Sequence, residues 1–262
     1  MALVPRSAAI ALALLLTAGP SAARDELGPY GQLPGGAAAS PSEAPPLMEG
    51  LGNRSFPIAT SDPRAQAYFD QGLRWSYGFN HGEAARAFRA AQRLDPACAL
   101  CAWGEALVLG PNINKPMDPA DLPTARAALD RARALAATAP PKEQALIAAL
   151  SQRYGEDGPR DAAYAEAMAD VARRFPDDHD IQALTAEAMM DTQPWDYWEA
   201  DKTTPKGYTE AVVATLERVL RADPDHPGAI HLYIHTVEAS ATPERALPYA
   251  QRLAAQMPAA GH

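Results

Sequence analysis

Two histidines near the C-terminal end of the sequence have the spacing of a helical metal-binding pair. His231 and His235 are four residues apart, so on a helix both rings project from one face. Imidazole nitrogens bind zinc and copper, and Glu238 could add a carboxylate ligand or act as a general base. His81 is a further candidate ligand. The order differs from the His-Glu-x-x-His of a metalloprotease helix, and two hydrogen-bonded structural histidines would have the same spacing.

Cys98 and Cys101 are the two cysteines of the chain and stand at the start of a predicted helix. Positions three residues apart share one face of a helix, and in an oxidising compartment such a pair favours a disulfide. Free buried thiols are the alternative. A thioredoxin-like redox motif is disfavoured, because the βαβ context that it needs is absent from the sequence.

Two loop segments carry polar and aromatic residues that could bind a ligand or partner. Because successive helices of a hairpin array run in opposite directions, the turns inside the hairpins all fall on one edge, and loops longer than packing requires are often functional. The candidates are Asn112, Asn114, Trp195, Asp196, Tyr197 and Trp198. In a purely structural interpretation, the asparagines satisfy backbone groups and the aromatic residues cap an apolar end.

The elements that must position these residues are helices. From Pro63 onward, alanine-rich periodic segments alternate with short Pro, Gly or Asp breaks, and nothing has the period of a strand. The predicted helix pairs are 64–78 with 81–95, 97–109 with 120–137, 141–154 with 160–174, 179–191 with 207–222, and 227–239 with 243–256. The sequence therefore predicts an all-α fold.

One helix pair matches the tetratricopeptide pattern of alternating large and small residues. The matching positions are Tyr68, Gly72, Trp75, Ala84, Phe88, Ala91 and the closing Pro96. Prolines that could close later units follow at irregular spacing. We expect residues 63–262 to form a right-handed α-solenoid of about five hairpins, since no hairpin of this kind buries its apolar face alone.

The N-terminal residues predict export. Residues 1–23 contain Arg6, an apolar run and small residues before Arg24, which is typical of a secretory signal peptide and too short to span a bilayer. Residues 24–62 are rich in Pro, Gly, Ala and Ser and predict a disordered linker. We expect a periplasmic or secreted protein without a membrane span. The last residues lack a polar closing helix, so we expect a truncated sequence or self-association through the last hairpin.

The net charge disfavours one class of partner. The chain carries a formal charge of −9 and has a pI near 5.1, so no basic face is expected to hold a nucleic acid. The sequence also lacks a nucleophile elbow, a phosphate loop and a dinucleotide fingerprint.

Several motifs together resemble a family of bacterial exported tetratricopeptide-repeat proteins, over nearly all of the predicted mature chain. These motifs are Gly78-Phe79-Asn80-His81, Leu94-Asp95-Pro96 with Cys98 and Cys101, Gly110-Pro111-Asn112-Ile113-Asn114, Pro194-Trp195-Asp196-Tyr197-Trp198, and His231-Leu232-Tyr233-Ile234-His235 with Glu238. The resemblance implies a helical-repeat fold and export, and it implies no particular reaction.

Two functional hypotheses follow. The first is an exported scaffold that binds a peptide or protein through its concave face or its loop edge. The second is a metal-binding protein or metalloenzyme that uses His231, His235, Glu238 and His81 with zinc or copper.

Overall fold

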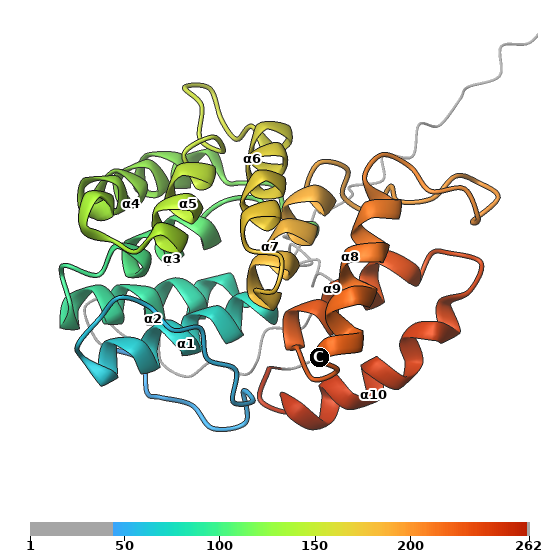
Figure 1. Cartoon of the computed structure of the whole chain (residues 1–262), viewed down its shortest axis with the longest axis horizontal. Helices are drawn as coiled ribbons and strands as arrows, with labels where there is room; N and C mark the ends of the chain where they lie inside the picture. Colours follow the sequence, from blue (N-terminus) through green and yellow to red (C-terminus); the bar gives the residue numbers. More distant parts are fainter. Residues whose placement is uncertain (1–43, 261–262) are drawn as a thin grey trace, which may run out of the picture. The chain divides into compact units, whose positions relative to one another are not determined.

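The computed structural model describes residues 44–260, which belong to one compact unit, Ser40–His262. The described part forms ten α-helices and no strand, which confirms the all-α prediction (Figure 1). The helices are α1 (Pro63–Tyr77), α2 (His81–Leu94), α3 (Ala99–Val108), α4 (Leu122–Leu135), α5 (Pro141–Leu150), α6 (Asp161–Arg174), α7 (His179–Met190), α8 (Thr209–Ala222), α9 (Pro227–Val237) and α10 (Leu247–Gln256). Between residues 44 and 260, none of them is long and apolar enough to cross a membrane. The predicted signal peptide and residues 24–43 lie outside the described residues.

Short-range signals set the helix boundaries. The side chains of Asp62, Asn80 and Asp178 accept backbone N–H groups at the starts of α1, α2 and α7, as N-cap residues do. Short 3-10 helices at Pro119–Asp121, Ala136–Thr138 and Pro243–Ala246 replace parts of predicted α-helices. The helix α5 ends at Leu150 rather than at 154, where a turn closes between Tyr154 and Pro159.

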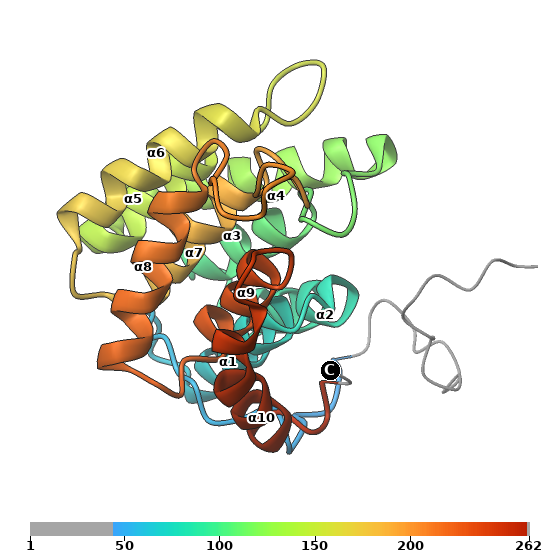
Figure 2. The ribbon, with the colours of Figure 1, turned by 90° about the vertical axis from the view of Figure 1, so that its right-hand side faces the viewer.

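Helices that are consecutive in the chain pack against each other along the whole described region. The helix α9 also packs against α7 and against α1, so the first and the next-to-last helices are neighbours (Figures 1 and 2). Residues from the two ends of the helical region therefore meet.

Two glycines explain the close packing of the first three helices. A Cβ atom added to Gly72 in α1 would lie 2.7 Å from the Phe88 ring, and one added to Gly104 in α3 would lie 2.5 Å from it. Phe88 is completely buried in α2. The ring thus fills the space that the two missing side chains leave.

A third glycine brings α9 onto α1. A Cβ atom on Gly228 would lie 2.5 Å from the ring of Tyr77, the last residue of α1. The Tyr77 hydroxyl also donates a hydrogen bond to Asp180 of α7 at 2.7 Å. Tyr77 therefore joins α1, α7 and α9 at one point.

Residues 44–62 pack against the helices, so the predicted disorder is wrong for this part of the linker. Leu51 and Phe56 are 1% and 3% exposed. The Tyr68 hydroxyl donates to the Pro45 carbonyl, and the backbone N–H of Phe56 donates to Asp70. A few apolar side chains and specific hydrogen bonds outweigh a composition that is typical of a flexible segment. We call residues 45–62 the strap.

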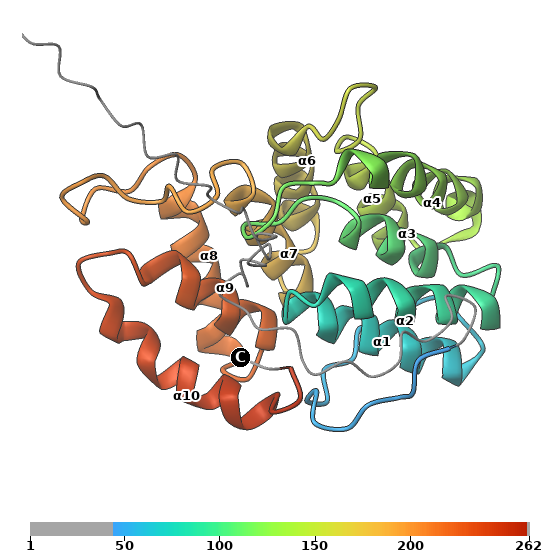
Figure 3. The same cartoon turned by 180° about the vertical axis from the view of Figure 1, so that it is seen from behind.

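The strap crosses the N-terminal ends of four helices (blue in Figures 1 and 3). Its hydrogen bonds run from Thr60 to Asp95 before α3, from the Ala59 N–H to Glu143 of α5, and from Arg54 to Asp180 of α7 and Asp223 before α9. Burial would raise the pKa of Asp180, but hydrogen bonds from His226 and Arg54 outweigh it and hold the pKa below its usual range.

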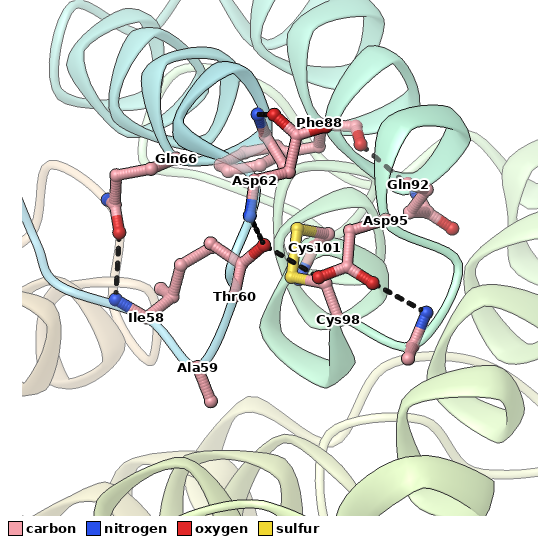
Figure 4. Close-up of a disulfide and its surroundings, with 12 residues drawn as sticks. Ile58, Ala59, Thr60, Asp62, Gln66, Phe88, Gln92, Asp95, Cys98 and Cys101 are labelled. Carbon is pink, nitrogen blue, oxygen red and sulfur yellow. Dashed lines mark hydrogen bonds between the residues drawn. A yellow bond between two sulfur atoms is a disulfide. The ribbon is translucent and has the colours of Figure 1, made fainter.

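Cys98 and Cys101 form a disulfide at the start of α3, with their Cα atoms 5.4 Å apart. Both cysteines are buried, and Cys98 Sγ accepts the N–H of Cys101 as an N-cap would. Figure 4 shows the disulfide beside the hydrogen bond between Thr60 of the strap and Asp95. The cross-link thus lies where the strap meets α3.

Replacing Phe56 tests whether the strap is part of the folded unit. We expect Phe56→Ala to lower the free energy of unfolding by about 3 kcal/mol, because a buried ring leaves a cavity. The control Leu47→Ala removes a side chain of the strap that is 51% exposed and should change stability by less than about 0.5 kcal/mol. Urea denaturation followed by circular dichroism measures both, and equal values would show that the strap does not contribute to stability.

The disulfide should contribute modestly, because it closes a very short loop. A Cys98→Ser/Cys101→Ser variant should lose about 2 kcal/mol of unfolding free energy, and the serine hydroxyl introduced at position 98 would still cap α3. The matched Cys98→Ala/Cys101→Ala variant should lose about 1 kcal/mol more, since it also lacks the cap. Denaturation under non-reducing conditions compares the two; identical losses would refute the capping role of residue 98.

Candidate functional site

The helix α9 places His231 and His235 at the junction with α1. Their side chains lie on one face of the helix, as the spacing predicts, and their Nε2 atoms are 2.9 Å apart. The two residues are 7% and 9% exposed. The pair is therefore a nearly buried contact between two imidazole nitrogens.

The other nitrogen of each ring has its own partner. His231 Nδ1 lies 2.6 Å from the backbone oxygen of Tyr77 at the end of α1. His235 Nδ1 lies 2.9 Å from Glu238 Oε1. Glu238 therefore contacts Nδ1, the ring nitrogen of His235 that does not contact His231. It orients the ring and is not a neighbour of the Nε2 atom.

Two aromatic rings from distant segments surround the pair. The Phe79 ring, just after α1, lies 4.4 Å from the His231 ring and stacks on the His235 ring at 5.9 Å, measured between centroids. The Trp195 ring, in the connection after α7, meets His235 edge-on at 5.1 Å. We call Phe79, Trp195, His231 and His235 the histidine–aromatic cluster.

Both aromatic residues of this cluster have an unfavourable backbone conformation. Phe79 has φ 53° and Trp195 has φ 64°, and Lys202 is the one other non-glycine residue between positions 44 and 260 with positive φ. Bulky residues rarely adopt this region, and strained residues often occur at functional sites. Gly78, which would tolerate the conformation, precedes Phe79 and has φ −91°. Trp195 is 46% exposed, so the side chain of a residue with a strained backbone faces solvent.

His81 does not join the pair. Its Nδ1 atom lies 3.2 Å from Asn112 Nδ2, and Phe79 is the residue that contacts both His81 and the pair. Burial, with the nearby Arg153 charge, lowers the pKa of His81 to about 4, so the ring is neutral at pH 7 and Nδ1 accepts the amide proton.

The predicted set of four metal ligands is not assembled. In the part of the chain that the structure describes, no three His, Cys, Asp or Glu side chains form a group that could hold a metal ion. The physical reasons are the burial of His81 against Asn112 and the use of Glu238 on the outer nitrogen of His235.

The two asparagines have different surroundings. Asn112 is buried, and its Oδ1 atom accepts the backbone N–H groups of Asn114 and Lys115, at 2.9 and 3.1 Å. It therefore closes the turn after Pro111 and contacts His81, which agrees with the structural interpretation. The Asn114 side chain is exposed and is the one of the two that a partner could contact.

The four candidate residues in the connection after α7 also differ in whether a partner could reach them. Tyr197 is 2% exposed, so it is not available to a partner and this part of the prediction is wrong. Trp198 donates its indole N–H to the Thr236 carbonyl and fixes the loop on α9. Asp196 is exposed and paired with Lys206. Trp195 and Asp196 remain as surface candidates.

A buried polar centre lies beneath this edge. Arg153 Nη2 donates to Asp191 and to the Pro111 carbonyl, each at 2.7 Å. A cavity of about 10 Å³, room for a single water molecule, is lined by polar and apolar groups. The polar lining residues are Ser76, His81, Arg153, Tyr164, Glu187 and Asp191.

Burial changes the protonation of the acids in this centre. It raises the pKa of Glu187 to about 7 and that of Asp191 well above its usual range, and the Arg153 charge limits both increases. One arginine thus faces two carboxyl groups that are costly to ionise together. None of these three residues was predicted from the sequence, although charged residues beside the apolar run of α7 and just after α5 were an available signal.

A second cavity, of about 110 Å³, lies between the strap and the ends of α8 and α10. Arg54 lines it, but its guanidinium is already bound to Asp180 and Asp223. This cavity therefore offers no unsatisfied positive charge to a ligand.

Comparisons with known proteins add no assignment. No family model matches the chain, and no curated protein and no solved structure is significantly similar to it. The interpretation of the site rests on its geometry.

Glu187 should make stability depend on pH. Its pKa is raised from 4.5 to about 7 in the folded state, so the folded state holds the extra proton between these values and stability falls as pH rises from about 4.5 to about 7. Glu187→Gln should therefore be more stable than the parent at pH 8, by roughly 3 kcal/mol, and similar to it at pH 4.5.

Urea denaturation at both pH values measures this difference. Glu166→Gln, an exposed change on α6, is the matched control and should follow the parent at each pH. A Glu187→Gln variant that is less stable than the parent at pH 8 would contradict the buried-charge interpretation.

Proposed function

We propose that this chain is an exported, tetratricopeptide-like scaffold that binds a peptide or protein partner through its loop edge. The observation that carries the proposal is the histidine–aromatic cluster, where Trp195 is 46% exposed and both aromatic residues have strained backbones. An exposed aromatic residue with a strained backbone, such as Trp195, is costly for a fold and is typical of a recognition surface.

Three observations support the repeat and export parts of the proposal. Each helix packs against the next one along the chain, and the Phe88 ring fills the space beside Gly72, as expected of a small and a large residue in the repeat pattern. We infer a right-handed solenoid from this pattern and from the motifs that resemble exported repeat proteins. The buried disulfide suits an oxidising compartment, and the N-terminal residues have the pattern of a signal peptide.

The loop edge is a better binding surface than the side that the strap covers. The strap occupies the N-terminal ends of α3, α5, α7 and α9 with its own hydrogen bonds. It also packs near the last helix, since the Ala259 N–H donates to the Gly50 carbonyl. Self-association through the last hairpin therefore has less support than binding at the opposite ends of the helices.

The chemistry of the edge favours an extended peptide with an apolar anchor. Trp195 offers a half-exposed ring, and the ion pair between Asp196 and Lys206 beside it offers polar contacts. A large apolar side chain against Trp195, flanked by polar residues, would use both features.

A peptide-display selection with the purified chain in the presence of EDTA tests the proposal. We expect selected peptides to share an apolar anchor and to lose about tenfold or more in affinity for a Trp195→Ala variant, because a central aromatic contact is removed. Fluorescence anisotropy measures the affinity.

Leu247→Ala is the matched control for this experiment. Leu247 is 55% exposed at the start of α10 and is not a residue of the cluster, so peptide affinity should not change. Failure to select any peptide, or equal affinities for the Trp195→Ala variant and the parent, would refute the proposed binding edge.

A further inference from the structure

The hydrogen-bond partners of the two histidine rings fix the positions of their protons. The Tyr77 carbonyl oxygen can only accept, so His231 Nδ1, 2.6 Å away, must donate. The Glu238 carboxylate accepts from His235 Nδ1 at 2.9 Å. A neutral imidazole carries one N–H group, so in neutral rings both Nε2 atoms present a lone pair.

These two Nε2 atoms face each other at 2.9 Å. Two lone pairs at this distance repel, and little water can screen them because the residues are 7% and 9% exposed. A cation that both nitrogens bind removes the repulsion. The arrangement therefore calls for a cation between the two nitrogens, either a proton, which makes the contact an N–H···N hydrogen bond, or a metal ion.

The separation of the nitrogens favours one coordination geometry. Two imidazole nitrogens at about 2.0–2.1 Å from a metal ion are roughly 3.3 Å apart in a tetrahedral site and about 2.9 Å apart when they occupy adjacent positions of a square plane. The observed distance is 2.9 Å. From this distance the rings would have to move less to bind Cu²⁺ or Ni²⁺ in a tetragonal geometry than to bind Zn²⁺ in a tetrahedral one.

The hydrogen-bond partners of the two Nδ1 atoms also agree with a metal site. Histidines that bind metals usually donate the second ring N–H to a carboxylate or a backbone carbonyl, which fixes the ring and makes the other nitrogen more basic. His235 has the first kind of partner and His231 has the second. Glu238 is thus a positioning residue for the site and not one of its ligands.

We propose that His231 and His235 bind one Cu²⁺ ion through their Nε2 atoms, with Ni²⁺ and Zn²⁺ bound more weakly. The site needs only these two protein nitrogens, and water can complete the coordination of the ion. Cu²⁺ forms the most stable complexes of the divalent first-row metals with nitrogen ligands, in agreement with the geometry. The inference goes beyond partner binding and does not rest on it, because the metal is bound without a peptide.

Titration of the purified, full-length, disulfide-bonded chain with Cu²⁺ against a chromophoric chelator tests the site. We expect one equivalent to bind, with an electron paramagnetic resonance spectrum of a tetragonal Cu²⁺ that has two nitrogen ligands. His235→Asn should weaken this binding by at least about tenfold, and Glu238→Ala by about tenfold, since outer partners typically contribute that much. Ni²⁺ and Zn²⁺ should compete more weakly than Cu²⁺.

His179→Asn is the matched control, because His179 begins α7 beside Asp223, at the strap side of the helices. It should bind Cu²⁺ as the parent does, and circular dichroism should show that both histidine variants are folded. Cu²⁺ binding that His235→Asn leaves unchanged would overturn the proposal. So would tighter binding of Zn²⁺ than of Cu²⁺, or ¹⁵N spectra of a metal-free chain that show a shared proton between the rings together with no Cu²⁺ binding. Peptide binding measured in EDTA is independent of each of these results.

Discussion

The contact of Tyr77 with Gly228 is the constraint on which the rest of the site depends. A side chain at position 228 would occupy the space of the Tyr77 ring, so only glycine lets α9 approach the end of α1 this closely. The backbone oxygen of Tyr77 accepts a hydrogen bond from His231 Nδ1, and the Tyr77 hydroxyl donates one to Asp180. One residue thus fixes the position of α9, orients a histidine ring and ties both to α7. Without this approach, Phe79 would not reach the histidine pair.

The strap maintains this junction from the other side. Asp180 is nearly buried, and a buried carboxylate is stable only when charged or polar groups neutralise it. Arg54 of the strap does so together with the Tyr77 hydroxyl and His226, which lies 3.3 Å from Asp180. Because Arg54 also binds Asp223, the strap connects α7 with the start of α9. Loosening the strap would therefore weaken the junction that positions the histidines, although the two lie at different ends of the helices.

The features of the fold and site that depend on local periodicity could be predicted from the sequence. The ten helices, the shared face of His231 and His235 and the proximity of the two cysteines all follow from spacing along one helix or turn. The packing of residues 44–62 could not be predicted, because composition reports average order and not the few contacts that Leu51 and Phe56 make. The role of Glu238 was missed for a similar reason. Spacing places it near the pair, but which nitrogen it binds depends on the orientation of the His235 ring, which stacks on Phe79 after α1.

The loop edge combines features that reduce stability, and this combination is informative. Phe79 and Trp195 have strained backbones, and Arg153 beneath them faces two carboxyl groups that burial makes costly to ionise. Each feature costs free energy that a purely structural helical array could avoid with a glycine, an apolar residue or an exposed charge. On the strap side, by contrast, Asp180 and Asp223 are neutralised by Arg54. These features gather where the connections of α1, α3, α5 and α7 meet, which supports the proposed binding at that edge.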